Sequence, residues 1–169
     1  MKELLMKLNA CKDAREWAGD KSWEEIYNTC HRGDWLLWLF KRTNPDDLQL
    51  LTLAKGHCAN TVRHLMKDER SIKAVDAAIA FGEGKISRDE LDAADAAAFA
   101  ASASAAAAYA DAASAASAAY AAYAAAYAAA AASDDAYAAY VADAAKKENQ
   151  QLTADICRKY LPIEVWNIK

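Results

Sequence analysis

The sequence predicts an all-α protein, and three observations support this prediction. Residues 93–145 are alanine at 35 of 53 positions and contain no Gly, Pro or Thr, and alanine has the best intrinsic helix propensity. On both sides of this tract, apolar residues recur at helical spacing. Two Ser-x-x-Glu capping boxes, at 22–25 and 87–90, mark helix starts. At 169 residues, the chain predicts a single-domain bundle of about eight or nine helices.

Residues 1–86 are rich in Trp and Leu and predict short helices. We expect helices over about 4–8, 10–18, 23–30, 35–40, 46–67 and 71–81. Gly19 and Gly33 are expected to end helices, whereas Asp34 and Asn44, the latter followed by Pro45, are expected to begin them as N-caps. The segment 35–40 is apolar on every face and should therefore be central in the fold.

The alanine-rich region, residues 87–148, is too long for one helix. A helix over 88–132 would measure nearly 70 Å at about 1.5 Å per residue. Tyrosines 109, 120, 123 and 127 fall on one stripe, and keeping carboxylates off that stripe requires breaks. We predict helices over about 88–103, 106–132 and 134–148, with no Gly or Pro to mark the first break. The stripe is interpreted as packing against the N-terminal half, with a partner-binding face as the alternative.

Residues 149–169 complete the predicted domain. Leu152, Ile156 and Tyr160 predict a last helix that Pro162 ends, and the apolar tail 163–168 is expected to dock on the body. The Trp- and Leu-rich helices should pack on the alanine-rich ones. Because alanine has little bulk, the alanine-rich axes should lie near the short end of the usual separation of about 8–10 Å.

Charge and composition exclude several classes of function. The net charge is −4, but residues 87–145 hold one Arg against eight carboxylates, which gives −7. Nucleic acid is therefore not an expected ligand, while a basic protein partner is compatible; a solvated acidic face is the simpler alternative. Asp111, Asp134 and Asp135 are the candidate partner-binding residues on this acidic part. No apolar run is long enough for a membrane span or signal peptide, and we expect a cytoplasmic protein with reduced cysteines.

A small-molecule pocket is the alternative site in the N-terminal half. Its candidate residues are Trp17, Asp34, Trp38, His57 and His64. At helical spacing within apolar runs, the tryptophans are more simply interpreted as core residues, and Asp34 as a helix cap.

The cysteines and histidines do not form a recognisable metal motif, since no CxxC or zinc-type spacing occurs. His57 and His64 lie seven residues apart on one expected helix face, next to Cys58, and His31 and Cys30 could join them after folding. A nucleophilic pair of Cys58 with a histidine is conceivable, but no oxyanion hole is evident. We therefore expect no metal, no cofactor and no enzymatic activity.

One ordered set of motifs spans most of the chain: Cys11, Ala14-Arg15-Glu16-Trp17-Ala18, Cys30-His31-Arg32-Gly33-Asp34-Trp35-Leu36-Leu37-Trp38-Leu39, Cys58-Ala59, Gly82-Glu83-Gly84 and the alanine tract. This order resembles an alanine-rich family of immunity proteins discussed with bacterial toxin–immunity systems. The resemblance implies a cytoplasmic inhibitor that binds a cognate protein toxin and neutralises it by occlusion. Its most specific part is Gly-Asp-Trp-Leu-Leu-Trp-Leu, residues 33–39. The resemblance brings no established binding residues with it.

Two other classes of function stay open. The first is a small-molecule-binding or enzymatic helical domain that uses the Trp and His residues of the N-terminal half. The second is a structural module that forms homo-oligomers through its alanine faces.

Overall fold

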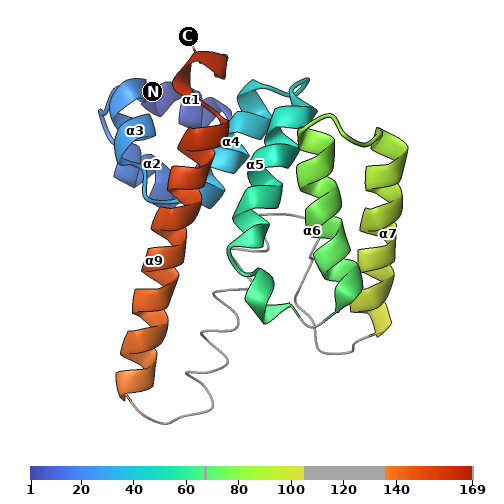
Figure 1. The fold of residues 1–169 in the computed structure, drawn as a ribbon. Helices are drawn as coiled ribbons and strands as arrows, with labels where there is room; N and C mark the ends of the chain where they lie inside the picture. Colours follow the sequence, from blue (N-terminus) through green and yellow to red (C-terminus); the bar gives the residue numbers. More distant parts are fainter. Residues whose placement is uncertain (67, 105–135, 169) are drawn as a thin grey trace.

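The computed structural model describes residues 1–66, 68–104 and 136–168, and these residues confirm the all-α class, with no strand among them (Figure 1). The α-helices within these ranges are α1 (Lys2–Lys7), α2 (Lys12–Ala18), α3 (Trp23–Thr29), α4 (Gly33–Thr43), α5 (Leu48–Asn60), α6 (Glu69–Gly82), α7 (Arg88–Ser104) and α9 (Ala136–Tyr160). Two short 3-10 turns are η1 (Arg63–Leu65) and η2 (Ile163–Val165). Across the described ranges, no helix has the length and apolarity needed to cross a lipid bilayer.

Both predicted capping boxes are present. The backbone N–H of Ser22 donates to Glu25 Oε2 at 2.7 Å, and the Glu25 N–H donates to Ser22 Oγ at 3.2 Å. The Ser87–Glu90 box repeats this exchange at 2.8 and 3.3 Å. Each box satisfies amides that the first helical turn leaves without partners, which explains why α3 and α7 begin where the sequence predicted.

Two other predicted helix starts are wrong. Asp34 is not an N-cap, because α4 already begins at Gly33, with Arg32 at the N-cap position. Gly33 therefore starts a helix and does not end the preceding one. Asn44 is not the cap of the next helix either: α5 begins at Leu48, with Asp47 before it.

The predicted helix ends also need correction. The helix expected over 46–67 ends at Asn60 and is followed by η1. The separate helices expected over 134–148 and from Leu152 to Tyr160 are one continuous helix, α9. The polar residues 148–150 between them contain no Gly or Pro, so they can continue a helix. The helix expected over 106–132 and its tyrosine stripe lie outside the described residues.

The longer helices lie next to one another, and the short helices α1, α2 and α3 lie together at one end (Figure 1). Helices α5, α6 and α7 lie side by side, and α4 and α5 pack against α9. The main core lies between α4, α5 and α9. Its most buried residues, at most 1% exposed, include Leu36, Phe40, Cys58, Cys157 and Leu161. The segment 35–40 is thus central, as predicted, although Trp35 and Trp38 are only half-buried.

Gly33 allows α4 and α9 to approach closely. A Cβ atom at this position would lie 2.6 Å from the backbone carbon and Oγ1 of Thr153. Between α5 and α6, a Cβ at Gly82 would lie 2.6 Å from Leu53 Cα. These separations are shorter than carbon atoms tolerate, so only glycine fits at either crossing.

The C-terminal tail docks on the body, as predicted. Trp166 is 7% exposed, and its indole Nε1–H donates to the carbonyl of Leu161 at 2.9 Å. Asn44, buried at the end of α4, donates to the carbonyl of Val165 at 2.7 Å and accepts from the N–H of Asn167 at 3.2 Å. Asn44 therefore holds the tail, which accounts for its burial away from a helix start.

Candidate binding site

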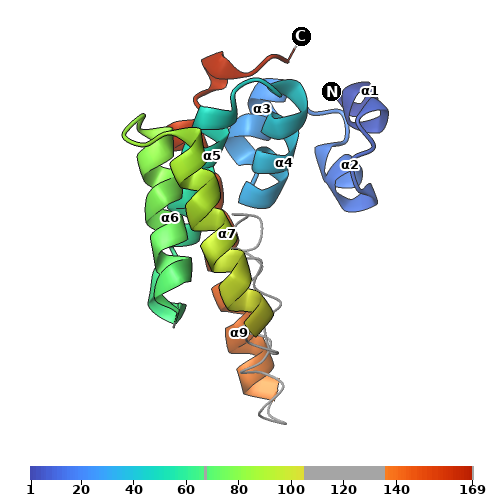
Figure 2. The ribbon, with the colours of Figure 1, turned by 90° about the vertical axis from the view of Figure 1, so that its right-hand side faces the viewer.

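A pocket of about 530 Å³ lies between the α1–α2 hairpin and α4. In Figure 2 this hairpin stands to one side of α4. The walls are mostly apolar, with the indole rings of Trp17, Trp35 and Trp38 as the largest groups and Arg32 and Asp34 as the charged ones. We call this space the tryptophan pocket. Its volume falls within the range of about 300–1,000 Å³ typical of ligand sites.

The tryptophans reach the pocket from two helices. Trp17 comes from α2, and its ring lies 5.9 Å from that of Trp35 on α4. The imidazole of His31 contacts both, at 6.0 Å from Trp17 and 6.4 Å from Trp35. Trp38 follows Trp35 by three residues and therefore lines the same side of α4. All three indoles are half-buried, so each packs on the fold and leaves part of its ring exposed.

The charged group of the tryptophan pocket is a bidentate ion pair. Arg32 donates from Nε to Asp34 Oδ1 at 2.8 Å and from Nη2 to Asp34 Oδ2 at 2.6 Å. The guanidinium also lies over the Trp35 ring, 4.6 Å from its centroid. The hydrogen bonds that Arg32 donates to the Asp34 carboxylate raise the pKa of Arg32, so Arg32 is a fixed cation at neutral pH.

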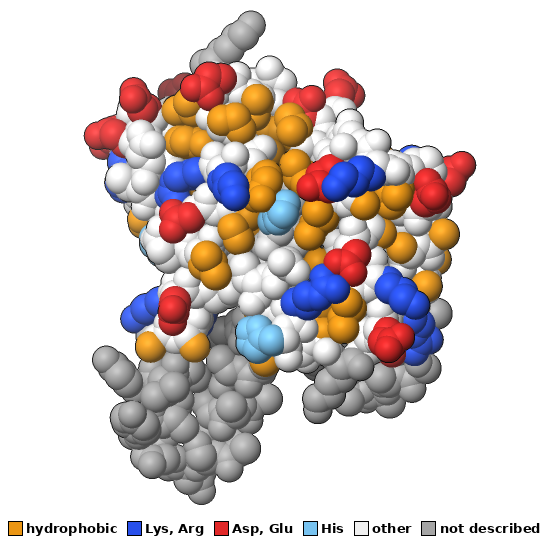
Figure 3. All heavy atoms as spheres, in the orientation of Figure 1, with side chains coloured by type: hydrophobic (Ala, Val, Ile, Leu, Met, Phe, Trp, Pro, Cys, Tyr) orange, Lys and Arg blue, Asp and Glu red, His pale blue; other side chains and the backbone are white. Residues whose placement is uncertain are grey.

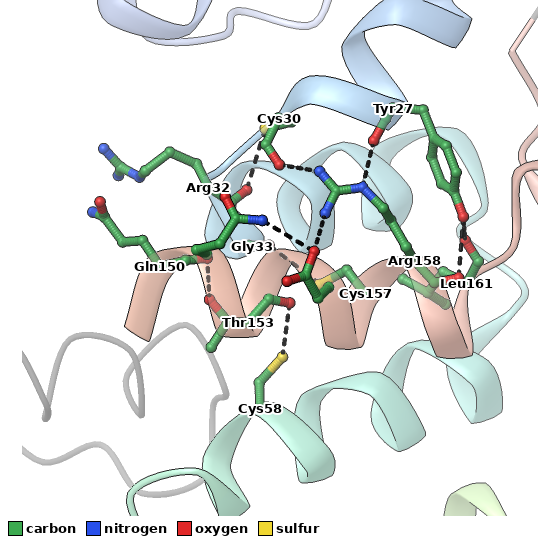
Figure 4. A network of polar contacts seen from close by, with 12 residues as sticks. Tyr27, Cys30, Arg32, Gly33, Cys58, Gln150, Thr153, Cys157, Arg158 and Leu161 are labelled. Atoms are coloured by element: carbon green, nitrogen blue, oxygen red, sulfur yellow. Dashed lines mark hydrogen bonds and ion pairs between the residues drawn. The ribbon is translucent and has the colours of Figure 1, made fainter. Parts of the chain in front are cut away.

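A hydrogen-bond network between α9 and the end of α3 holds the backbone at Cys30, which lines the pocket (Figure 4). Arg158 on α9 donates from Nε to the carbonyl of Tyr27 at 2.8 Å and from Nη2 to the carbonyl of Cys30, a pocket residue. The Tyr27 hydroxyl donates in return to the carbonyls of Arg158 and Leu161, at 3.1 and 3.2 Å. Arg158 thus satisfies carbonyls left free at the end of α3, and Tyr27 satisfies carbonyls at the end of α9. Together these bonds fix the segment that leads into Arg32.

The structure brings together three of the five residues predicted for the alternative site. Trp17, Asp34 and Trp38 line the tryptophan pocket, whereas His57 and His64 do not. His57 stacks on Tyr160 of α9, with ring centroids 4.0 Å apart and an interplanar angle of 6°. His64 lies in η1, beyond the end of α5, so the expectation that both histidines share one helix face is wrong.

Arg32 is the charged residue of the pocket that sequence reasoning missed. It lies two residues before the expected cap Asp34, inside the motif that carries the resemblance. The opposite charges of Arg32 and Asp34, one residue either side of Gly33, were the available signal.

Three of the four cysteines are inaccessible to solvent. Cys30, Cys58 and Cys157 are buried, while Cys11 is exposed at the pocket. Burial raises the pKa of Cys30, and a hydrogen bond with Cys58 together with burial raises the pKa of Cys157. The thiol of Cys58 hydrogen-bonds to the carbonyl of Thr153 at 3.7 Å. Among the described residues, no group of three or more His, Cys, Asp or Glu is placed to hold a metal ion.

A smaller cavity of about 170 Å³ lies among α5, α6 and α7. Lys55, Arg88, Asp92 and Asp95 line it together with small apolar residues. Arg88 is paired with Asp92 at 2.7 Å, and burial lowers the pKa of Lys55. The tryptophan pocket is about three times larger and is the better candidate.

The predicted partner-binding residues Asp111, Asp134 and Asp135 lie outside the described residues. Comparison with protein-family models, with curated proteins and with solved structures found no match to this chain.

Proposed function

We propose that this chain is a non-catalytic binding protein of the immunity type, which neutralises a cognate toxin by occlusion and anchors it at the tryptophan pocket. One observation carries the proposal. The most specific part of the resemblance, residues 33–39, forms one wall of the pocket, because Asp34, Trp35, Leu36, Trp38 and Leu39 all line it. The remaining glycine of the motif is explained by its close approach to Thr153.

The chemistry of this wall suits a protein contact. Trp and Arg are the residue types most enriched among those that dominate binding energies, particularly in pockets that exclude water. Here, half-buried indoles surround a pre-formed hollow, so binding orders few additional side chains and costs little conformational entropy. Occlusion requires only such a surface and no reacting group.

The test fills the pocket without removing any packed side chain. Ala14, half-buried on α2, lines the pocket, and Ala14→Phe places a ring in the space. Ala96→Phe is the control, because Ala96 is exposed on α7. We expect Ala14→Phe to abolish protection of cells that express the cognate toxin domain, and Ala96→Phe to protect fully. A folded Ala14→Phe protein that still protects would contradict the pocket as anchor.

The acidic region gives a second, independent test of the same function. If the toxin is basic, Asp111→Lys with Asp134→Lys and Asp135→Lys should weaken protection while leaving most helicity intact. The wild-type association rate should then fall steeply with added salt, since complementary charges act mainly on encounter. Full protection by the folded triple variant would mean that the acidic region is only a solvated surface.

Small-molecule binding is the second candidate function, and the volume and aromatic lining of the tryptophan pocket favour it. Protein purified from its native cells should then release a stoichiometric compound on denaturation, detected by mass spectrometry. Ala14→Phe should release none, and neither the wild type nor this variant should protect cells against a toxin.

A further inference from the structure

Each tryptophan of the pocket has a cation of the protein over its ring. Lys21 Nζ lies 4.6 Å from the Trp17 ring centroid, and the Arg32 guanidinium lies 4.6 Å from that of Trp35. The guanidinium of Arg42 lies 5.7 Å from the Trp38 ring centroid. Three cations thus border the aromatic walls, and the pocket itself contributes one carboxylate, Asp34.

This arrangement argues against a cationic occupant. A group of tryptophans is the usual site for a quaternary ammonium or methylated lysine, because the ring face attracts positive charge. Here, the protein's own cations already use that attraction on all three rings. A further cation would be repelled by them, whereas an anionic group would be attracted.

Arg32 offers a specific place for such a group. Its pair with Asp34 uses Nε and Nη2, which leaves Nη1 outside the pair. A guanidinium has five N–H donors in a fixed plane, so Nη1 can donate to an oxygen of an occupant while the ion pair stays intact. The side chains of Arg32 and Asp34 are 28% and 29% exposed, so this end of the pocket is open to an incoming ligand.

We infer that the tryptophan pocket takes an apolar, aromatic body that carries an anionic oxygen group, with the ring among Trp17, Trp35 and Trp38 and the oxygen at Arg32 Nη1. This inference rests on the proposed binding function and names the chemistry of the occupant. The same chemistry occurs in a free aromatic carboxylate and in an aromatic residue at the C-terminus of a protein partner.

The experiment compares two fluorescent probes that share one aromatic body. Anilinonaphthalenesulfonate carries a sulfonate, and phenylnaphthylamine lacks it. Because a charge-assisted hydrogen bond is gained, the sulfonate should bind about tenfold more tightly to the wild-type chain. Arg32→Gln should remove this preference, because it should lower the affinity for the sulfonate probe and leave the affinity for phenylnaphthylamine unchanged. Lys41→Gln is the matched control, since it removes one charge from an exposed position of α4 outside the pocket.

The exposed thiol of Cys11 reports where the probes bind. It lines the pocket, and the other three cysteines are buried, so iodoacetamide should alkylate Cys11 first. Bound sulfonate probe should slow this alkylation in the wild type and have no effect in Ala14→Phe.

The outcomes separate this inference from the proposed function. One outcome is that both probes bind with equal affinity, protect Cys11 and no longer bind to Ala14→Phe. The pocket is then a binding site, and the anionic preference is wrong. If neither probe responds to Ala14→Phe, the inference is overturned, while the pocket as toxin anchor is decided by the protection assay with the same variant. When the preference holds, displacement by indoleacetate and by a short peptide ending in tryptophan, with a free or an amidated carboxyl, shows which source fits.

Discussion

Two aromatic clusters of similar composition differ in how they are closed. In the first, Trp166 lies 4.8 Å from Trp23 and 4.9 Å from Phe40, with Tyr27 at 6.3 Å. In the second, Trp17 and Trp35 lie 5.9 Å apart, and Trp38 lines the same pocket. The first, which we call the closed cluster, brings together α3, α4 and the C-terminal tail. The second, the open cluster, joins only α2 and α4 and borders the tryptophan pocket.

The difference shows how one residue type serves stability in one place and binding in another. In the closed cluster, a segment from the far end of the chain covers the rings, and Trp166 is 7% exposed. In the open cluster, the covering element is a short hairpin that leaves a cavity of about 530 Å³ beside the rings. The burial of an aromatic ring therefore depends on which element packs over it.

The largest expected effect on folding comes from removing the N-terminal half of the chain, which supplies α3 and α4 to the closed cluster. A fragment of residues 87–169 keeps α9 and Trp166 but lacks α3, α4 and α5, against which Ala154, Cys157 and Leu161 are buried. By circular dichroism, this fragment should be helical, because alanine favours local helix, and it should melt without cooperativity. A sharp two-state melt would show that the C-terminal half has a core of its own.

Trp166→Ala and Trp38→Ala compare the two clusters directly. Removing a buried aromatic ring typically costs about 3–5 kcal/mol, and Trp166 should fall in this range. Trp38 is half-buried and borders a cavity, so Trp38→Ala should cost roughly half as much. Urea unfolding measures both values. Equal losses would mean that the open cluster is as much a part of the core as the closed one.

Gly33→Ala should disturb the support of the tryptophan pocket. The added Cβ would meet the backbone of Thr153 at 2.6 Å, and such overpacking should cost about 1–3 kcal/mol. Gly84→Ala is the comparison, because there the Cβ meets only a side-chain nitrogen at 3.3 Å, although φ is +72°; the left-handed backbone should cost about 1 kcal/mol. Gly33→Ala with wild-type thermal stability would contradict the close helix crossing.

A small pH effect is expected from His57, which lies in neither cluster. Burial lowers the pKa of His57; the charge of Glu83 opposes this shift in part, and that of Lys159 adds to it by a smaller amount. The folded pKa is therefore below the unfolded value of about 6.5, and the unfolded chain binds the proton more readily. The stability from neutral His57 is fully present above that value and is lost as the pH falls through the folded pKa.

His57→Phe keeps an aromatic ring against Tyr160 and removes this titration. Its free energy of unfolding should decline less than that of the wild type as the pH falls below about 6.5. His64→Gln, which removes an imidazole from η1, is the control. Parallel wild-type and His57→Phe curves would show that burial does not disfavour the charged imidazole.

The sequence by itself determined the helical class and several helix starts. Alanine propensity and the capping boxes at Ser22 and Ser87 act within about four residues, so they could be interpreted without knowing what surrounds them. The pattern Leu152, Ile156 and Tyr160 likewise predicted a helix, and the apolar tail predicted docking. The same local rules failed where a long-range contact used the residue differently: Asn44 resembles an N-cap but holds the tail through Val165 and Asn167.

Only the tertiary structure decided the binding site. Trp17 and residues 34–39 come from different helices, and no local rule states the angle at which α2 meets α4. The pocket is lined by side chains of both the α1–α2 hairpin and α4, so it depends on how these elements meet. The opposite side of α4 is closed by the contact of Gly33 with Thr153, 120 residues away in the chain. The distances between α4 and its neighbours depend on how whole helices pack. They cannot be derived from the type of one residue or from the spacing of residues along the chain.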